Sequence, residues 1–393
     1  VYVRPRWFRL RALPLSVTHM AVATASGVIS ALLVLAGVAV TAQPHPAAGG
    51  PPATPPPAAG ATPPPAVGPP KAPPLPAGPP KFPAILAFGD SVADTGNNNH
   101  LRTFIRSNFP PYGKDFPGHK HTGRFSNGKI SVDLLASALG VKELLPPYLK
   151  KGLSIEELKT GVSFASAGNG FDNATCRTMS ALTMERQLQL FQEYKEKVGG
   201  SVPDKALYFI VTGSNDIVEH FTFADGITEP GYAESMVSRA IAYVQSLADL
   251  GAKRIALVGA PPVGCLPSQR MIAGGLRKQC ATDRNQLALL FNHRVGQEMA
   301  KLGVRLPGVT LVNVDIYTIL ADVIYRPEAF GLNNTHDACC GYIGLAAAVL
   351  CNFASPLCKD PSKYLFWDSY HPTERGYQIL IDAIVAKYFR FMH

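Results

Sequence analysis

Five short apolar runs alternate with longer stretches of helical periodicity after residue 83, and this alternation limits the possible folds more than any other feature of the sequence. The apolar runs lie at residues 84–88, 161–165, 206–212, 254–259 and 310–314. The helical stretches lie at residues 129–139, 183–197, 234–250, 283–302 and 374–389. Short apolar strands that alternate with helices are typical of βαβ units, whose parallel sheet is covered on both faces. We therefore predict a three-layer α/β/α domain over residues 84–393, with a doubly wound, five-stranded parallel sheet in the flavodoxin-like order.

The segment before this domain has a different composition. Residues 43–83 contain 18 of the 35 prolines of the chain and have no periodic apolar face. Such a segment cannot offset its ordering entropy by burial, so we expect a disordered stalk that is partly polyproline II. Two roles remain open for it, a passive linker and a spacer that interacts with its surroundings.

The first 42 residues carry the pattern of an export signal. Residues 28–40 (VISALLVLAGVAV) form an apolar run of signal-peptide length, and Thr41-Ala42 completes a small-residue site for cleavage after Ala42. The chain begins with Val1, and Met20 is a candidate initiator. A membrane anchor is the alternative, although an apolar run this short falls below the ~20 residues that span a bilayer. We expect residues 1–42 to be a signal peptide with a possible upstream extension.

The charge of the chain does not indicate a nucleic-acid partner. The formal net charge is +9, but six of the basic residues and none of the acidic ones precede residue 84. The predicted domain is therefore close to neutral, and it shows neither a clustered basic face nor a recognisable nucleic-acid-binding module. No Cys/His spacing resembles a zinc site, so we expect neither a metal nor a cofactor.

A serine and a distant Asp/His pair are the strongest candidates for chemistry. Ser91 follows the first predicted strand in Gly89-Asp90-Ser91, where a glycine permits a sharp turn. A serine hydroxyl is a poor nucleophile unless a histidine takes its proton, and that histidine needs an acid to orient it. Asp368 and His371 supply both groups near the other end of the domain, just before a predicted helix. We predict that the three side chains form a catalytic triad.

Several motifs, taken together and in order, resemble one enzyme family. Residues 88–91 (FGDS), 213–216 (GSND) and Asp368-x-x-His371-Pro372 resemble the blocks of the GDSL (SGNH) hydrolases. Further blocks resemble the plant branch of that family, and with the proline-rich leader the chain resembles the anther-specific proline-rich members of that branch. These blocks are 88–99 (FGDSVADTGNNN), 111–113 (PYG), 123–129 (GRFSNGK), 264–270 (GCLPSQR) and 339–341 (CCG). The resemblance spans roughly residues 84–390 and implies an α/β/α esterase without a cofactor.

The resemblance also implies an oxyanion hole. Its donors would be the backbone N–H groups of Ser91 and Gly168 and the side-chain amide of Asn215. Gly168 lies in residues 163–170 (SFASAGNG), where the family pattern Asn-x-Ala-Ser-Gly-Gly is altered, because Ser163 and Ala167 replace the Asn and the first Gly. Gly168 is the preferred backbone donor, and the Ala167 N–H is the alternative.

We expect other polar residues near these motifs to have structural roles. We expect Asp90 to stabilise a turn and Asp216 to be structural, and Asn215 has helix capping as its alternative role. Residues 124–127 either line the cleft or start a helix. Isolated histidines are more often structural than catalytic, and this applies to His119, His121, His220, His293 and His336.

Seven cysteines favour an oxidising compartment, as do two glycosylation sequons at Asn173 and Asn333. We predict that Cys265 and Cys280 form one disulfide. Cys339 and Cys340 each pair with Cys351 or Cys358, in an order that the sequence leaves open, and Cys176 is the odd thiol.

The function predicted from these features is the hydrolysis of carboxylic esters outside the cell, in the cell wall, through an acyl-enzyme. The ester could belong to a lipid, to cutin or to an acetylated polysaccharide. Two alternatives remain, an acyltransferase with the same triad and a non-catalytic cell-wall protein whose stalk carries the role. The sequence does not indicate an oligomeric state.

Overall fold

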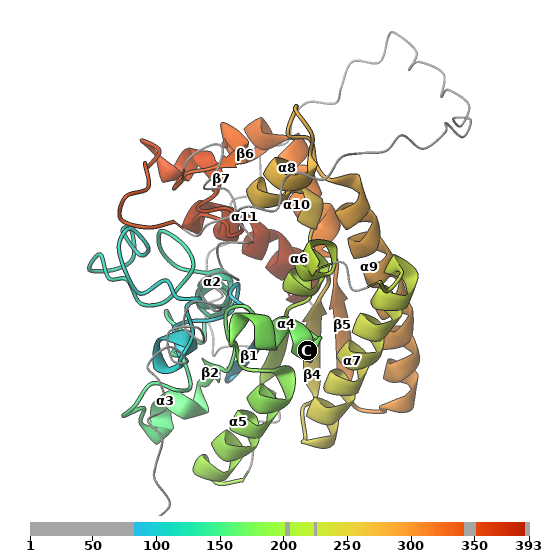
Figure 1. Ribbon diagram of the computed structural model, residues 1–393. Coiled ribbons are helices and arrows are strands. Elements are labelled where there is room, and N and C mark those ends of the chain that lie inside the picture. The colour runs from blue at the N-terminus through green and yellow to red at the C-terminus, as the bar shows by residue number, and fades with distance from the viewer. Residues whose placement is uncertain (1–81, 201–204, 224–225, 342–350, 390–393) are drawn as a thin grey trace, which may run out of the picture. The chain divides into compact units, whose positions relative to one another are not determined.

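The computed structural model describes residues 82–200, 205–223, 226–341 and 351–389 (Figure 1). The predicted signal peptide and the predicted stalk up to residue 81 lie outside these residues. Within the described part, the main sheet has five strands in the order β2-β1-β3-β4-β5, and every neighbouring pair is parallel. The predicted α/β fold with its flavodoxin-like strand order is therefore confirmed. The strands are β1 Ile85–Gly89, β2 Gly161–Ser163, β3 Leu207–Val211, β4 Arg254–Val258 and β5 Thr310–Val314.

The strands are apolar because helices cover both faces of the sheet. Every residue of β1 in the centre is buried, whereas the edge strand β5 is partly exposed. For this reason, strands of a parallel sheet are apolar along their whole length. They lack the alternation of apolar and polar residues that is typical of a sheet covered on one face only. Phe82, which falls in the predicted stalk, is also buried and contacts the ring of Phe389, so core packing begins two residues before the predicted boundary.

Three long helices cover one face of the sheet, and α7 and α9 lie side by side along it (Figure 1). Phe191 of α5 contacts Phe88 and Tyr208, which places their side chains on that face. Phe209, the next residue of β3, contacts Phe389 on the opposite face, where α2, α10 and α11 pack together. The helices of the first face are α5 Met184–Lys197, α7 Glu229–Asp249 and α9 Thr282–Arg305; those of the second are α2 Ser131–Ala138, α10 Ile316–Tyr325 and α11 Glu374–Ile384.

The structure adds elements that the sequence did not predict. A second, two-stranded parallel sheet lies near the C-terminus, and among the described residues five further α-helices were not predicted. α7 begins five residues before its predicted start because the Thr228 hydroxyl accepts the Gly231 N–H and Pro230 occupies the first turn. The predicted helix 374–389 is α-helical only to Ile384 and continues as a π-helical turn, Val385–Phe389. The added elements are α3 Ile155–Lys159, α4 Asn173–Met179, α6 Ser214–Phe223, α8 Pro267–Ala273, α10 Ile316–Tyr325, β6 Asn334–Ala338 and β7 Tyr364–Phe366.

All seven cysteines lie within the described residues, and six of them form disulfides. The predicted Cys265–Cys280 bond is present, with 4.3 Å between the α-carbons. The pairing that the sequence left open is Cys339–Cys358 and Cys340–Cys351. Cys176 is the unpaired thiol, and burial raises its pKa to about 12, so it is unreactive as a thiolate at neutral pH.

No helix among the described residues is long and apolar enough to cross a bilayer. The apolar run at residues 28–40, for which a membrane anchor was the alternative, lies outside those residues.

Candidate active site

A tight turn at the carboxyl end of β1 presents Ser91. Gly89 has a φ of +122°, and a β-carbon there would lie 1.8 Å from the carbonyl oxygen of Val211 on the neighbouring strand. Only glycine fits this position, since any side chain would collide with the β3 backbone. Asp90 then turns the chain: its carboxylate accepts the Val92 N–H at 2.9 Å and its carbonyl accepts the N–H groups of Ala93 and Asp94.

Asp90 therefore makes the turn contacts that the sequence predicted for it. The carboxyl is buried, and this burial raises its pKa to about 7 despite the hydrogen bond from Val92 and the charge of His371. Asp90 holds the backbone that carries Ser91.

The loop after β7 brings Asp368 and His371 together. One carboxylate oxygen of Asp368 accepts the backbone N–H groups of Tyr370 and His371 at 2.9 and 2.8 Å. The His371 Nδ1 lies 2.8 and 2.9 Å from the two carboxylate oxygens of Asp368. A backbone hydrogen bond from Trp367 to His371 closes the loop at 2.7 Å. The spacing of three residues thus becomes a closed turn in which acid and imidazole touch.

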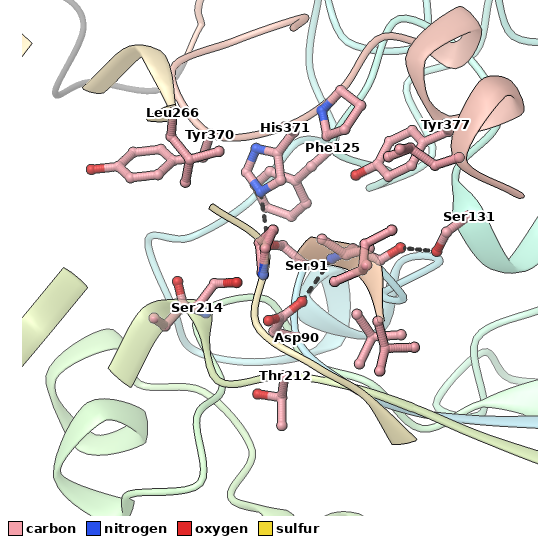
Figure 2. A pocket seen from close by; sticks show the side chains of 18 of the residues that line it. Asp90, Ser91, Phe125, Ser131, Thr212, Ser214, Leu266, Tyr370, His371 and Tyr377 are labelled. Atoms are coloured by element: carbon pink, nitrogen blue, oxygen red, sulfur yellow. Dashed lines mark hydrogen bonds between the residues drawn. The ribbon is translucent and has the colours of Figure 1, made fainter. Parts of the chain in front are cut away.

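His371 reaches Ser91 from the other end of the domain. Its Nε2 lies 2.7 Å from the Ser91 Oγ, across 280 positions of the sequence (Figure 2). The three predicted triad residues therefore form one continuous hydrogen-bonded chain. Asp368 is fully buried, whereas Ser91 and His371 keep a small exposed area. This arrangement has the geometry in which a histidine can take the proton of an attacking hydroxyl.

Residues 124–127 hold the histidine loop and start no helix, because α2 begins later, at Ser131. Ser126 donates to the carbonyl of Pro372 at 3.0 Å, and the Asn127 side-chain oxygen accepts the N–H of Glu374 at 2.9 Å. Glu374 is the first residue of α11, so Asn127 caps a helix distant in sequence instead of its own. Phe125 lines the cavity beside the His371 ring, with 4.8 Å between the ring centroids.

Arg124, unlike Phe125, does not line the cavity. Its guanidinium is buried and forms an ion pair with Asp133 of α2 at 2.7 Å. It also donates to the carbonyl oxygens of Thr95 and Leu145. Arg124 therefore crosslinks three loops behind the site.

Tyr112, for which the sequence predicted no role, completes the polar contacts of Asp368. Its hydroxyl donates to the second carboxylate oxygen at 2.7 Å, and the residue is buried. Burial opposes ionisation of Asp368, but the charge of and hydrogen bond from His371, the Tyr370 N–H and the Tyr112 hydroxyl together hold the carboxyl pKa below its usual value. Tyr112 lies in the block at residues 111–113 that contributed to the family resemblance, and this was the only available signal.

The turn at residues 166–170 decides between the two candidate backbone donors. The Ala167 N–H donates to the Asp94 carboxylate at 3.0 Å, so it is already engaged. Gly168 lines the cavity, and its N–H has no hydrogen-bond partner among the described residues. Its φ is +85°, and a β-carbon would lie 2.6 Å from that of Met179. Gly168 is thus the better-placed donor.

The fold accommodates Ser163 and Ala167, the two residues that differ from the family pattern. The Ser163 hydroxyl donates to the Ala93 carbonyl at 2.7 Å, tying β2 to the turn after Ser91. Ala167 is fully buried, so its methyl group fills space that a glycine would leave open.

Asn215 lies in the first turn of α6 and lines the same cavity as Ser91. Its amide nitrogen donates one hydrogen bond to the carbonyl of Asn169 at 2.8 Å. A primary amide has two N–H groups, so a second donor remains. Asp216 accepts the N–H groups of Phe171 and Asp172 and the Thr175 hydroxyl, which agrees with its predicted structural role.

A cavity of about 250 Å³ opens beside Ser91 (Figure 2). Most of its wall is apolar. Polar lining residues that follow strand ends, as expected for a doubly wound sheet, include Asp90, Ser91, Thr212, Asn215 and His371, and Ser131 and Glu219 line it from helices.

The isolated histidines do not take part in this site. His220 is buried and stacks on Tyr232 with 4.3 Å between the ring centroids, while the other four are exposed. Among the described residues, no group of three or more His, Cys, Asp or Glu side chains is placed to hold a metal ion.

Comparisons with known proteins give a consistent result. Residues 85–384 match the model of the family described as GDSL-like Lipase/Acylhydrolase. The Arabidopsis thaliana protein "GDSL esterase/lipase At5g42170" is 41% identical over 316 residues, which cover 78% of this chain and 86% of the relative. "GDSL esterase/lipase At1g20120" is 43% identical over 318 residues, with 77% and 79% covered. "GDSL esterase/lipase EXL3" is 40% identical over 318 residues, with 78% and 87% covered.

Proposed function

The chain belongs to the GDSL-like lipase/acylhydrolase family and is a carboxylic ester hydrolase, and from this premise we propose that it works through an acyl-enzyme on Ser91. The observation that carries the proposal is the hydrogen-bonded chain from Ser91 to His371 to Asp368, with distances of 2.7 and 2.8 Å. Family membership alone gives the reaction class, and this geometry supports the role that we propose for each residue.

In the first step, the Ser91 Oγ attacks the ester carbonyl while His371 Nε2 takes the hydroxyl proton. The new C–O bond converts the carbonyl into an oxyanion, which accepts hydrogen bonds from the N–H groups of Ser91 and Gly168 and from the free amide N–H of Asn215. The intermediate collapses, the bond to the alcohol breaks, and His371 returns the proton to the departing alkoxide.

In the second step, water replaces the alcohol. His371 takes a proton from the water as the water oxygen adds to the acyl carbon. The intermediate then collapses, the bond from the acyl carbon to Ser91 Oγ breaks, and His371 returns the proton to Oγ as the carboxylic acid leaves. Asp368 keeps the His371 ring in the orientation that presents Nε2 to Ser91 and stabilises the positive charge that forms on the imidazole. Substitution of another alcohol for water would make the same site an acyltransferase, so the ratio of acid to new ester in the presence of added alcohol separates the two activities.

The test is Ser91→Ala assayed on a short aryl ester, because the substitution removes only the attacking oxygen. We expect turnover to fall by at least ~10⁴ while the melting temperature is retained. Ser246→Ala is the matched control, since Ser246 lies on the exposed side of α7 and its hydroxyl bonds only to the Ala242 carbonyl. Normal turnover by folded Ser91→Ala protein would contradict the proposal.

We also propose that the protein acts outside the cell, in the cell wall. Three disulfides support an oxidising compartment, and Asn333 of the second sequon is exposed on the surface. The signal peptide and the stalk through which the enzyme would associate with the wall lie outside the described residues. Expression of the full chain as a fluorescent fusion tests the localisation, and retention in the cytosol would contradict it.

A further inference from the structure

The cavity beside Ser91 continues along one face of α11. Tyr377, Leu380, Ile381 and Ile384 all line it, and their spacing of three, four and seven residues places them on one side of the helix. At 1.5 Å per residue, Tyr377 and Ile384 are separated by about 10 Å along the helix axis. The cavity therefore reaches well beyond the triad into the layer between α11 and the sheet.

The other walls of this channel are apolar as well. Ile316 and Leu320 are one turn apart on α10. Phe209 and Val211 are alternate residues of β3, so both point to the face of the sheet that α11 covers. Two helices and one face of the sheet thus enclose the channel with aliphatic and aromatic side chains.

Polar groups are concentrated at the end of the channel that holds the triad. Asp90, Thr212 and Asn215 follow strand ends beside Ser91, whereas Leu320, Leu380 and Ile384 lie away from them. Tyr377 marks the boundary: Figure 2 shows its hydroxyl on the side of the ring nearer Phe125 and His371, and the hydroxyl has no partner among the described side chains and backbone. Along α11 beyond Tyr377, the residues that line the cavity are Leu380, Ile381 and Ile384, which offer only hydrophobic contact.

The size of the cavity distinguishes between classes of ester. A volume of 250 Å³ is many times the ~10–15 Å³ that one water-sized group requires. An acetyl group extends by a single methyl from the carbonyl, so it would leave most of this space unfilled. An acyl chain bound at Ser91 would instead exclude water from the whole apolar wall.

We propose that the channel along α11 is the acyl pocket of the enzyme and that its substrates are esters of medium- or long-chain acids, in contrast to acetyl esters of polysaccharides. The proposal rests on the proposed function, since the acyl carbonyl must lie at Ser91. Each methylene group that enters the channel leaves water, and this raises kcat/KM about fourfold until the channel is full. Activity therefore increases with acyl length and then levels off.

The experiment measures kcat/KM for aryl esters of acetic, butanoic, octanoic and dodecanoic acid with purified full-length protein. We expect the octanoyl ester to exceed the acetyl ester by on the order of a thousandfold, because it adds six methylene groups. Ile384→Phe fills the distal part of the channel, so the dodecanoyl ester should lose about tenfold or more while the butanoyl ester changes little. Ile384→Ala should extend the range to longer chains.

Ile379→Phe is the matched control. It makes the same substitution on the same helix at a buried residue that does not line the cavity. We expect it to change all four esters by one common factor, and melting temperatures separate loss of fold from loss of fit. Equal loss of acetyl and dodecanoyl activity in Ile384→Phe would overturn the proposal.

The outcomes separate this proposal from the function on which it rests. If Ser91-dependent hydrolysis is present but is fastest for the acetyl ester, the acyl pocket is wrong and the esterase mechanism stands. If no ester is turned over in a Ser91-dependent way, both fail.

Two natural sources supply long acyl chains, and two further assays distinguish them. Acid release from dispersed long-chain acylglycerol indicates a lipid source, and release from a polyester of hydroxy fatty acids indicates a cutin-like source. Either result supports the proposal. Release of acetate from acetylated xylan without release from the other two substrates contradicts it.

Discussion

The two sides of the active site are built in different ways. On the acid–base side, Asp368 and His371 lie three positions apart, and the loop between β7 and α11 folds back on itself to join them. On the oxyanion side, Gly168 and Asn215 follow different strands, and buried Asp94 and Asp216 hold their loops in place through backbone N–H groups. The first side is local in sequence, and the second is assembled by the sheet.

The buried carboxyl groups that support the two sides also differ in the direction of their pKa shifts. Contacts with His371, Tyr370 and Tyr112 overcome burial at Asp368 and lower its pKa. At Asp94 and Asp216 burial prevails over the hydrogen bonds and raises the pKa of each to about 6. The carboxylate that supports the histidine is thus held ionised over a wide pH range, while those that support the oxyanion loops become protonated in mild acid.

Loss of the acid–base side should have the largest effect on turnover. Asp368→Asn keeps the shape of the side chain but removes the charge that orients and stabilises the His371 imidazole, so we expect kcat to fall by ~10⁴. Initial rates on a short aryl ester, together with melting temperature, measure this. Asp249→Asn on the exposed end of α7 is the control. A loss below tenfold would mean that the histidine is oriented without this acid.

Loss of the oxyanion side should have a smaller effect. Asn215→Ala removes one donor, and we expect kcat to fall by ~10²–10³ at nearly unchanged stability. Asn215→Asp, which replaces the donor with an acceptor, should be no better than Ala. If Asn215 only holds the Asn169 carbonyl, Asn215→Ala should instead cost about 1 kcal/mol in the free energy of unfolding and leave kcat intact.

Tyr112→Phe should have the smallest effect of the three and refines the acid–base side. The substitution leaves one buried oxygen of Asp368 with His371 Nδ1 at 2.9 Å as its remaining hydrogen-bond partner, so we expect kcat to fall about tenfold and KM to change little. A carboxyl whose pKa is lowered in the folded state stabilises the protein above its unfolded pKa of about 4, and this contribution is lost as the pH falls through the folded pKa. Removal of the Tyr112 hydroxyl raises the pKa of Asp368, so acid unfolding should begin at a higher pH than in the wild type. Tyr364→Phe is the control, because Tyr364 is half-buried against the apolar cluster that contains Tyr112, and its hydroxyl makes no hydrogen bond to Asp368 within the described part of the chain. An unchanged acid-unfolding midpoint would assign Tyr112 to packing alone.

The difference between the two sides also explains what the sequence could predict. The five strands of the main sheet were predicted because apolar runs bounded by helices are a local signal. Ser91 and His371, which lie in contact, were proposed from short motifs. Tyr112 was missed because its contact with Asp368 joins residues 256 positions apart. The choice of Gly168 over Ala167 depended on the bond from Ala167 to Asp94, which no local pattern encodes.

The same reasoning applies to the capping of α11 and to the second sheet. Asn127 reads as the start of its own helix, and only the fold brings it to Glu374. β6 and β7 pair in parallel across a segment closed by two disulfides, whose pairing the sequence left open. The acyl channel is likewise absent from the sequence pattern, because residues that line a cavity and residues that fill a core have the same periodicity on α11.

The central claim is that His371 activates Ser91 as a nucleophile, and covalent labelling with an alkyl fluorophosphonate tests it most directly. The account predicts one phosphonyl group per molecule, located on Ser91 by mass spectrometry of the digested protein, with labelling absent in Ser91→Ala and slowed by orders of magnitude in His371→Ala. Labelling of another residue, or of Ser91 at an equal rate in folded His371→Ala protein, would contradict it.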